Sequence, residues 1–418
     1  MLKNYIKIAW KVLLRRKFFT FISLFGISFT LMILMVATAM IDHVTGSHTP
    51  ETHLDRTLFI NFIKMTGKKQ GSMMNTTPSY YYLTHYVKTL KTPEKISISS
   101  VFKGVNSYVN NKRLSLDLKY TDAEFWEILE FKFLEGKPFN RQDLKNANKV
   151  AVITRHTRDQ YFGAGVSAVG KYLVADGIRY QVCGVVEDVP ISRFNSYAHL
   201  WVPVSTANIN KADTGLPGDY NGIILAKSAS DIPEIQAEYQ HIVKQIKVPD
   251  PKNYDTFSSY AEGILEGMFV RQVFGDRYTG ESGMGKFIAF VTLIVFLFML
   301  MPTINLININ VSRILERSSE IGVRKAFGAS SRTLIGQFLV ENIFLTLLGG
   351  FLGFLLSALA LQLISNSGII PYAQLTLNWR VFGIGIGLSL LFGLLSGVIP
   401  AYKMSKLQAV EALKGGNL

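Results

Sequence analysis

The stretch GESGMGKF (residues 280–287) differs by one residue from a phosphate-binding P-loop. A P-loop binds phosphates through the backbone N–H groups of a glycine-rich loop and through its lysine, and the following Ser or Thr holds Mg²⁺. Phe287 occupies that last position and cannot bind a metal ion. A P-loop also follows a buried strand, whereas a polar segment precedes this stretch and an apolar run follows it. The match is therefore interpreted as accidental.

Histidine and cysteine are the next residue types that could support catalysis or metal binding. All seven histidines lie between residues 42 and 286, and the five-residue spacing of His43, His48 and His53 distributes them around a helix. A single cysteine, Cys183, excludes an internal disulfide and a cysteine-based zinc site. It lies in the alternating run RYQVCGVV, which predicts a half-buried strand position. The sequence predicts no catalytic residues, no metal site and a protein that is not an enzyme.

The chain of 418 residues is 48% hydrophobic and only 18% charged, which indicates a membrane protein. A helix needs about 20 mostly apolar residues to cross the hydrocarbon core. The first candidate span has no charge and is too long for the core of a signal peptide. Four spans place both termini on the same side of the membrane. The predicted spans are residues 18–41, 287–311, 334–364 and 381–402.

Positive charge gathers in three short segments beside these spans. Residues 1–17 carry a net charge of +6, residues 312–333 carry +3 and residues 403–418 carry +2, which together make +11 of the formal +14. Short segments rich in Lys and Arg face the cytoplasm, whereas the connection 365–380 is uncharged until Arg380. Both termini are therefore predicted to be cytoplasmic. The charge is explained by topology, so no nucleic-acid partner is expected.

Residues 42–286 are then an extracytoplasmic domain with α/β patterning. Strands are predicted in RTLFINFIKM, KISISSVF, NKVAVIT and GIRYQVCGVV, and helices in TDAEFWEILEF and SDIPEIQAEYQHIVKQI. The predicted fold class is an α-helical membrane protein with four transmembrane helices. An α/β extracytoplasmic domain is inserted between the first and second of these helices.

The basic segment 312–333 between spans two and three has the pattern of a short amphipathic helix. Glu320 precedes Arg324 by four residues, the favourable order for a helical ion pair. Gly328 suits a helix end, and Ser330 or Ser331 suits the N-cap of the next helix. On these residues alone, an ordinary basic loop between two spans is the alternative.

The run ERSSEIGVRKAFGASSRTLIGQFLVEN resembles the signature of the MacB/FtsX-type ABC transporter permeases. The ending PAYKMSKLQAVEALKGG resembles the C-terminal motif of that family, and NKVAVITRHTRDQYFG with VGKYLVADGIRYQVCGVVEDVP resembles the periplasmic core domain of its MacB-like members. The resemblance covers the whole layout: a basic N-terminal helix, one span, a large extracytoplasmic domain and three further spans.

The resemblance implies that segment 312–333 is a coupling helix, which binds a groove of a separate cytoplasmic ATPase. The chain would then hold no cofactor, because the partner subunit binds ATP. An exposed aromatic beside charged residues is a suitable interface anchor. The predicted coupling residues are Glu320, Gly322, Arg324, Lys325, Phe327, Gly328 and Ala329.

The resemblance also implies a bacterial inner-membrane protein that works as a homodimer or with a paired permease, and a periplasmic adaptor is a further candidate partner. Its expected function is export of drugs, peptides or lipoproteins by mechanotransmission. The alternative is an FtsX-like regulator that activates an extracytoplasmic cell-wall hydrolase.

The intramembrane Glu341 is predicted either to couple helices or to reach partners at the interface such as Arg332. Gly349 and Gly353 permit close helix contact, which we expect within the protomer.

Overall fold

The computed structural model divides into two units, and each is described by itself. The helical unit comprises Met1–Asp42, Ile288–Ile369 and Gln374–Leu418, and the α/β unit comprises His43–Phe287 and Ile370–Ala373. The described residues are 10–11, 13–15, 17–67, 72–109, 112–210, 212–276, 280–316, 323, 327, 330–369, 371–372, 375 and 379–405.

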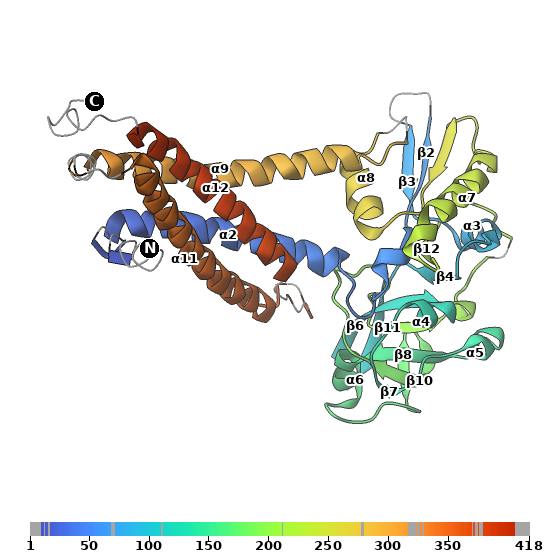
Figure 1. Cartoon of the computed structure of the whole chain (residues 1–418). Helices are drawn as coiled ribbons and strands as arrows, with labels where there is room; N and C mark the ends of the chain where they lie inside the picture. The colour runs from blue at the N-terminus through green and yellow to red at the C-terminus, as the bar shows by residue number, and fades with distance from the viewer. Residues whose placement is uncertain are drawn as a thin grey trace. The chain divides into compact units, whose positions relative to one another are not determined.

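Long apolar helices form the helical unit, in which α11 and α12 pack side by side (Figure 1). Each predicted span lies inside one helix: α2 (Lys17–Thr45), α9 (Met284–Glu316), α11 (Ser331–Asn366) and α12 (Trp379–Ser405). Among the described residues, Lys17–Thr45 and Ile335–Asn366 are long and apolar enough to cross a membrane. The apolar stretches Met284–Leu300 and Phe382–Leu395 are shorter. The four-span topology therefore stays a prediction.

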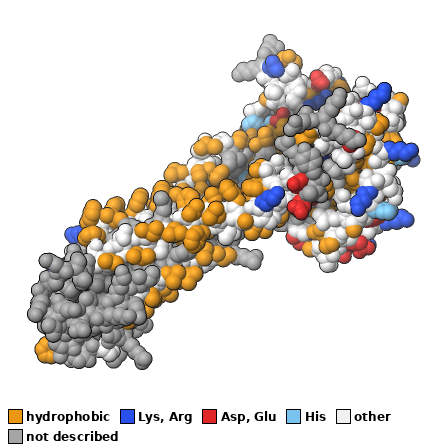
Figure 2. Space-filling model, turned by 90° about the horizontal axis from the view of Figure 1, so that it is seen from above, with side chains coloured by type: hydrophobic (Ala, Val, Ile, Leu, Met, Phe, Trp, Pro, Cys, Tyr) orange, Lys and Arg blue, Asp and Glu red, His pale blue; other side chains and the backbone are white. Residues whose placement is uncertain are grey.

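Hydrophobic side chains cover much of the visible surface of the helical unit, whereas charged side chains gather on the α/β unit (Figure 2). On α2, Phe21, Phe25 and Phe29 are 66%, 54% and 43% exposed. Their rings stack one turn apart, with centroids 6.1 and 5.3 Å from each other. Such a contiguous aromatic row is unfavourable in water and suits contact with lipid or another apolar surface.

The α/β unit is built on a ten-stranded mixed sheet whose main path runs β1-β12-β4-β6-β11-β8-β10-β7. Strand β5 pairs with β6 and β9 pairs with β10 outside this path, and a second sheet has the order β13-β2-β3. The strands are β1 (Thr57–Ile60), β2 (Ile63–Thr66), β3 (Met73–Thr76), β4 (Lys95–Ser100), β5 (Lys103–Val109), β6 (Lys112–Thr121), β7 (Phe133–Gly136), β8 (Val150–Thr154), β9 (Tyr172–Ala175), β10 (Ile178–Val186), β11 (Leu200–Pro203), β12 (Tyr220–Leu225) and β13 (Thr256–Ser259).

Short helices and turns connect these strands. Helix α7 begins after Asp231 and has Pro233 in its first turn, and its buried residues Ile235, Tyr239 and Val243 recur on one helical face. The α-helices are α3 (Tyr80–His85), α4 (Glu124–Ile128), α5 (Arg141–Lys145), α6 (Arg155–Phe162), α7 (Ile232–Gln245) and α8 (Arg271–Phe274). The other helical turns are η1 (Leu54–Arg56), η2 (Val87–Thr89), η3 (Val204–Thr206), η4 (Ala229–Asp231) and η5 (Glu266–Val270).

The large sheet is buried on both faces at its β1-β12 edge. Leu58 and Ile224 pack with α3 and α7 on one face, whereas Phe59 and Ile223 pack with α4 on the other. Alternate side chains of a strand point to opposite faces, so apolar residues at successive positions indicate burial on both sides. The predicted strands in KISISSVF, NKVAVIT and GIRYQVCGVV are confirmed as β4, β8 and β10. Cys183 is half-buried on β10, as predicted.

Strands were also predicted in RTLFINFIKM, and the structure has two strands there, β1 and β2. The run forms two strands in different sheets, β1 paired with β12 and β2 paired with β13. Asn61 and Phe62 lie between them, and Ile60 and Ile63 on either side belong to the same buried cluster. Both strands therefore contribute to one core although they belong to different sheets.

Candidate functional site

Close packing of small residues joins α11 to α2 within the helical unit. A Cβ atom added at Gly349 would lie 2.8 Å from Ile27 Cγ2, and one added at Gly353 would lie 3.0 Å from the carbonyl oxygen of Ser28. These distances leave no room for a side chain, so glycine permits the two backbones to approach. The predicted contact within the protomer is confirmed for these two positions.

Helix α11 also carries a row of buried polar side chains: Gln337, Glu341, Asn342 and Thr346. Gln337 Nε2 donates to Glu341 Oε1 at 3.2 Å, one turn along the helix. Glu341 is only 4% exposed, so its side chain is buried within the helical unit. Its coupling role stays a prediction, and the side chain of Arg332 lies outside the described residues.

Part of the predicted coupling segment can be located. The Phe327 N–H donates to the Val323 carbonyl at 3.0 Å, the spacing of one α-helical turn. The Phe327 side chain is 88% exposed and Val323 is 44% exposed. Ser330 caps α11 by accepting a hydrogen bond from the Thr333 N–H, as one of the two predicted alternatives. The other coupling residues, Glu320, Gly322, Arg324, Lys325, Gly328 and Ala329, lie outside the described residues.

The P-loop-like stretch forms the turn that leads into α9. Gly280 and Gly283 have φ values of +76° and +79°, and a Cβ atom at Gly283 would lie 2.3 Å from the Phe274 carbonyl oxygen. Glycine is required at Gly283 because there is no space for a side chain and because other residues rarely adopt this positive φ. The element before this turn is the short helix α8, whereas a P-loop follows a strand. The geometry supports the interpretation that the sequence match is accidental.

The three spaced histidines have separate partners. His43 Nε2 lies 3.0 Å from Ser192 Oγ, His53 Nε2 lies 3.4 Å from Glu130 Oε1, and His48 forms a backbone bridge with Glu51. Within the described ranges, no group of three or more His, Cys, Asp or Glu side chains is arranged to hold a metal ion.

A fully buried ion pair lies in the α/β unit near the start of that unit. Arg193 Nη1 lies 2.9 Å from Glu51 Oε2, and the two side chains are 2% and 0% exposed. Arg193 Nη2 also donates to the carbonyl oxygens of His43 and Gly46, both at 2.9 Å. Ser196 Oγ donates to Glu51 Oε1 at 2.8 Å. These bonds satisfy both charges and tie residues 43–51 to the loop that precedes β11.

Lys119 is buried beside this pair. Its Nζ donates to the carbonyl oxygens of Phe194 and Asn195 at 3.0 and 2.7 Å. Burial lowers the pKa of Lys119 from 10.5 to about 7, and the neighbouring Glu51 charge opposes that shift.

The depressed pKa of Lys119 predicts a pH-dependent stability. The unfolded chain keeps this proton up to its ordinary pKa, so folding releases it between about pH 7 and about pH 10.5. The stability gained by burying Lys119 in its neutral form is therefore fully present above about pH 10.5 and is lost as the pH falls through about 7. We expect the free energy of unfolding to rise by up to about 1.4 kcal/mol per pH unit in this window. Urea unfolding of the full-length protein should show this slope, and Lys119→Met should flatten it. An equal slope in both proteins would contradict the assignment.

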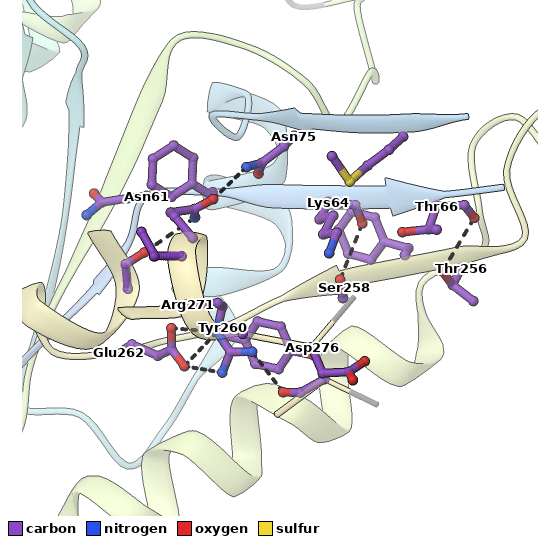
Figure 3. A pocket seen from close by; sticks show the side chains of 18 of the residues that line it. Asn61, Lys64, Thr66, Asn75, Thr256, Ser258, Tyr260, Glu262, Arg271 and Asp276 are labelled. Atoms are coloured by element: carbon purple, nitrogen blue, oxygen red, sulfur yellow. Dashed lines mark hydrogen bonds and ion pairs between the residues drawn. The ribbon is translucent and has the colours of Figure 1, made fainter. Parts of the chain in front are cut away.

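A cavity of about 560 Å³ lies between the three-stranded sheet and the segment η5-α8 (Figure 3). Strand pairing places Thr256, Thr66 and Met73 in one row and Ser258, Lys64 and Asn75 in the next. All six line the cavity. The alternate residues of β2, Ile63 and Met65, are buried on the opposite face of the sheet.

Arg271 is held firmly at one side of this cavity. Its Nε donates to Glu262 Oε1 and Oε2 at 2.9 and 2.8 Å, and its Nη1 donates to the Gly280 carbonyl at 2.8 Å. The guanidinium stacks 3.6 Å from the centre of the Tyr260 ring, as Figure 3 shows. Burial raises the pKa of Glu262 more than the hydrogen bonds from Arg271 lower it. The sequence carried no signal for this cavity, because its walls come from segments about 190 residues apart in the chain.

Comparison with known protein families identifies two matching regions in the chain. Residues 20–242 match the model of the MacB-like periplasmic core domain, and residues 292–409 match the FtsX-like permease C-terminal model. The first match alone covers more than half of the chain. The chain belongs to the MacB/FtsX-type ABC transporter permeases. Members of this family are membrane permeases, consistent with the two long apolar helices found here.

Named relatives of this permease span most of its length. It is 25% identical over 350 residues to the uncharacterized ABC transporter permease YknZ of Bacillus subtilis, a match that covers 82% of each chain. It is also 25% identical to the macrolide export ATP-binding/permease protein MacB of Escherichia coli K12, over 98% of this chain. The permease spans only 60% of the length of MacB.

Solved structures similar to this permease include two extracytoplasmic regions. The extracellular domain of YknZ is 13% identical, covers 48% of this chain and 98% of its own, and has a TM-score of 0.35. The periplasmic region of MacB from Actinobacillus actinomycetemcomitans is 15% identical, covers 49% of this chain and 87% of its own, and also has a TM-score of 0.35.

Proposed function

We propose that this permease couples ATP hydrolysis by a separate cytoplasmic ATPase to movement of its α/β unit, which drives export. The observation that carries the proposal is Phe327, an aromatic side chain 88% exposed between α9 and α11. Large exposed aromatics are unfavourable in water and are enriched where partners bind. The FtsX-like match covers the same segment.

The proposed ATPase partner is a separate chain, and this permease holds no cofactor. Gly280 and Gly283, which precede α9, lie against Arg271 and Phe274, and this supports the division of labour. We expect a homodimer or a paired permease in the bacterial inner membrane, with a periplasmic adaptor as a further partner. Drugs, peptides or lipoproteins are the proposed cargo, since one relative is named for macrolide export. The regulatory alternative stays a prediction from the sequence.

The proposal requires that an ATPase accompanies the full-length permease. Affinity purification from its native membrane in mild detergent should recover an ATP-binding-cassette protein, identified by mass spectrometry. The purified permease without that protein should show no ATP hydrolysis, and the complex should hydrolyse ATP. Recovery of the permease free of any such protein under several solubilisation conditions would contradict the proposal.

The predicted orientation can be tested by cysteine labelling. Cys183 is a poor labelling site because burial raises its pKa to about 12 and its Sγ donates to the Ala151 carbonyl. In a Cys183→Ser background, Thr214→Cys in an exposed loop should react with a membrane-impermeant maleimide added to cells with a permeabilised outer envelope. If labelling requires an opened inner membrane, the orientation is the reverse of the predicted one.

A further inference from the structure

The large sheet of the α/β unit is joined weakly at one place, between β4 and β6. Strand β4 pairs with β12 along its whole length, and β5 pairs with β6 along its whole length. Among the described residues, however, β4 and β6 pair only at Ser99 and Thr121. In Figure 1, β12 and β4 lie above β6, β11 and β8 in this unit. The β4–β6 junction therefore divides the sheet into two halves, β1-β12-β4 and β6-β11-β8-β10-β7.

The hydrophobic core is divided at the same junction on one face of the sheet. Ile98 of β4 and Leu118 of β6 lie on this face, because each is an odd number of residues from the paired position of its strand. They nevertheless belong to two separate buried clusters. On the opposite face, a single cluster contains both Ile223 of β12 and Trp201 of β11. The two halves thus share a core on one side of the sheet, which is the arrangement of a hinge.

A row of buried polar side chains crosses the junction. Asn221 on β12 pairs with Ser99 on β4, and Ser99 pairs with Thr121 on β6. All three residues are 0% exposed, and the polar atoms of their side chains have no hydrogen-bond partner among the described residues. Burying a polar group without a hydrogen bond costs free energy, and contact with water removes that cost. This polar row therefore makes opening of the junction less unfavourable.

Asp122, directly after β6, links the two halves through its side chain. Its Oδ1 accepts from Ser97 Oγ at 2.6 Å, and its Oδ2 accepts from the Ile98 N–H at 2.9 Å, so both oxygens bind donors of β4. Oδ2 also accepts from Lys88 Nζ at 2.9 Å. Hydrogen bonds to a charged group are stronger than those between neutral groups. One carboxylate thus takes the place of ladder bonds between the two strands.

We infer that the β4–β6 junction is a hinge within the α/β unit, and that Asp122 holds it closed. The pivot lies at the other end of the junction, where the Val101 N–H donates to the Asp219 carbonyl at 2.8 Å. Both chain connections between the halves pass through this point. Opening breaks the contacts of Asp122 to β4 and lets water reach the polar row, while the shared core keeps the halves attached. The hinge does not depend on the proposed ATPase or cargo.

Cysteine accessibility in the full-length protein in detergent tests the hinge. In a Cys183→Ser background, Ser99→Cys places a thiol at a fully buried position of the junction, and Ala151→Cys places one at a fully buried position of β8. A buried thiol reacts with a maleimide after an opening that exposes it. With each rate normalised to that of the urea-unfolded variant, we expect Ser99→Cys to react at least about tenfold faster than Ala151→Cys. Equal rates would show that both thiols react through unfolding of the whole unit and would overturn the inference.

A further substitution tests the role of Asp122. Asp122→Asn keeps the shape of the side chain but replaces one acceptor oxygen by a donor. We expect it to speed labelling of Ser99→Cys at least about tenfold and to leave labelling of Ala151→Cys unchanged. An equal increase at both cysteines would contradict the role assigned to Asp122. If Asp122→Asn does not fold, the comparison of the two cysteines decides alone.

Glu262→Gln is the matched control for Asp122→Asn. Both carboxylates accept hydrogen bonds from a cationic side chain, and both side chains are 6% exposed. Glu262 lies outside the β4–β6 junction and pairs with Arg271. Glu262→Gln should therefore leave the labelling rate of Ser99→Cys unchanged, and an increase equal to that of Asp122→Asn would also contradict the role of Asp122.

Discussion

Phe327→Ala should separate the permease from its ATPase while leaving its own fold intact. The side chain is 88% exposed, so its removal costs the isolated chain little. If it fills a pocket of the partner, truncation costs roughly 2 kcal/mol or more, which is about thirtyfold in affinity. Co-purification with the ATPase should fall accordingly, and the ATP hydrolysis rate of the complex should fall with it. Glu320→Lys should have a similar effect by reversing a charge in the same predicted coupling segment.

Matched variants make this result specific. Tyr108 is also an exposed aromatic, at 66%, but it lies in the α/β unit, so Tyr108→Ala should leave ATPase binding unchanged. Leu355→Ile, a conservative change in α11, should also have little effect. Normal binding and normal stimulation in both Phe327→Ala and Glu320→Lys would reduce segment 312–333 to a basic loop that only sets the topology.

Arg193→Met should be among the most destabilising substitutions in the α/β unit. It leaves the Glu51 carboxylate buried without its ion-pair partner, and it removes the donor to the His43 and Gly46 carbonyls. Breaking a buried pair by removing one partner costs about 3–5 kcal/mol. Denaturant unfolding of the full-length protein, followed by tryptophan fluorescence to which the buried Trp201 contributes, measures the loss.

Two controls distinguish charge burial from general damage. The double variant Arg193→Met/Glu51→Gln removes both charges and should recover a large part of the lost stability, because neither member of the pair is left as an unpaired buried charge. Lys132→Met breaks the Lys132–Glu187 pair, in which the side chains are 63% and 41% exposed, and should change stability by less than about 1 kcal/mol. A mild effect of Arg193→Met, equal to that of Lys132→Met, would show that the pair is not important for stability.

Much of the α/β unit could be predicted because its strands carry local patterns. Apolar residues at successive positions in β8 and the alternation around Cys183 in β10 were sufficient to identify those strands. The apolar periodicity of α7 and the proline in its first turn are equally local. In the run at residues 56–65 the apolar pattern continues across Asn61, and only the pairing partners of β1 and β2 reveal the change of sheet.

The family resemblance was readable in the sequence because its motifs are contiguous, and the comparisons confirmed it. The predicted coupling residues, by contrast, stay predictions, since only Phe327 among them lies within the described residues. Its side chain is 88% exposed in the structure.

The sequence by itself determined the apolar helices and the strand-forming runs, because each depends on neighbours within one element. It also determined the family, because the family motifs are contiguous. Tertiary structure alone decided which polar residues are buried. On β6, Leu114, Leu116 and Leu118 alternate with polar residues, so periodicity places Lys119 on a solvent face. It is fully buried because the loop carrying Arg193, Phe194 and Asn195 covers that face and supplies carbonyl oxygens to its ammonium group. Contacts between segments about 75 residues apart depend on how the strands assemble, and no local pattern encodes them.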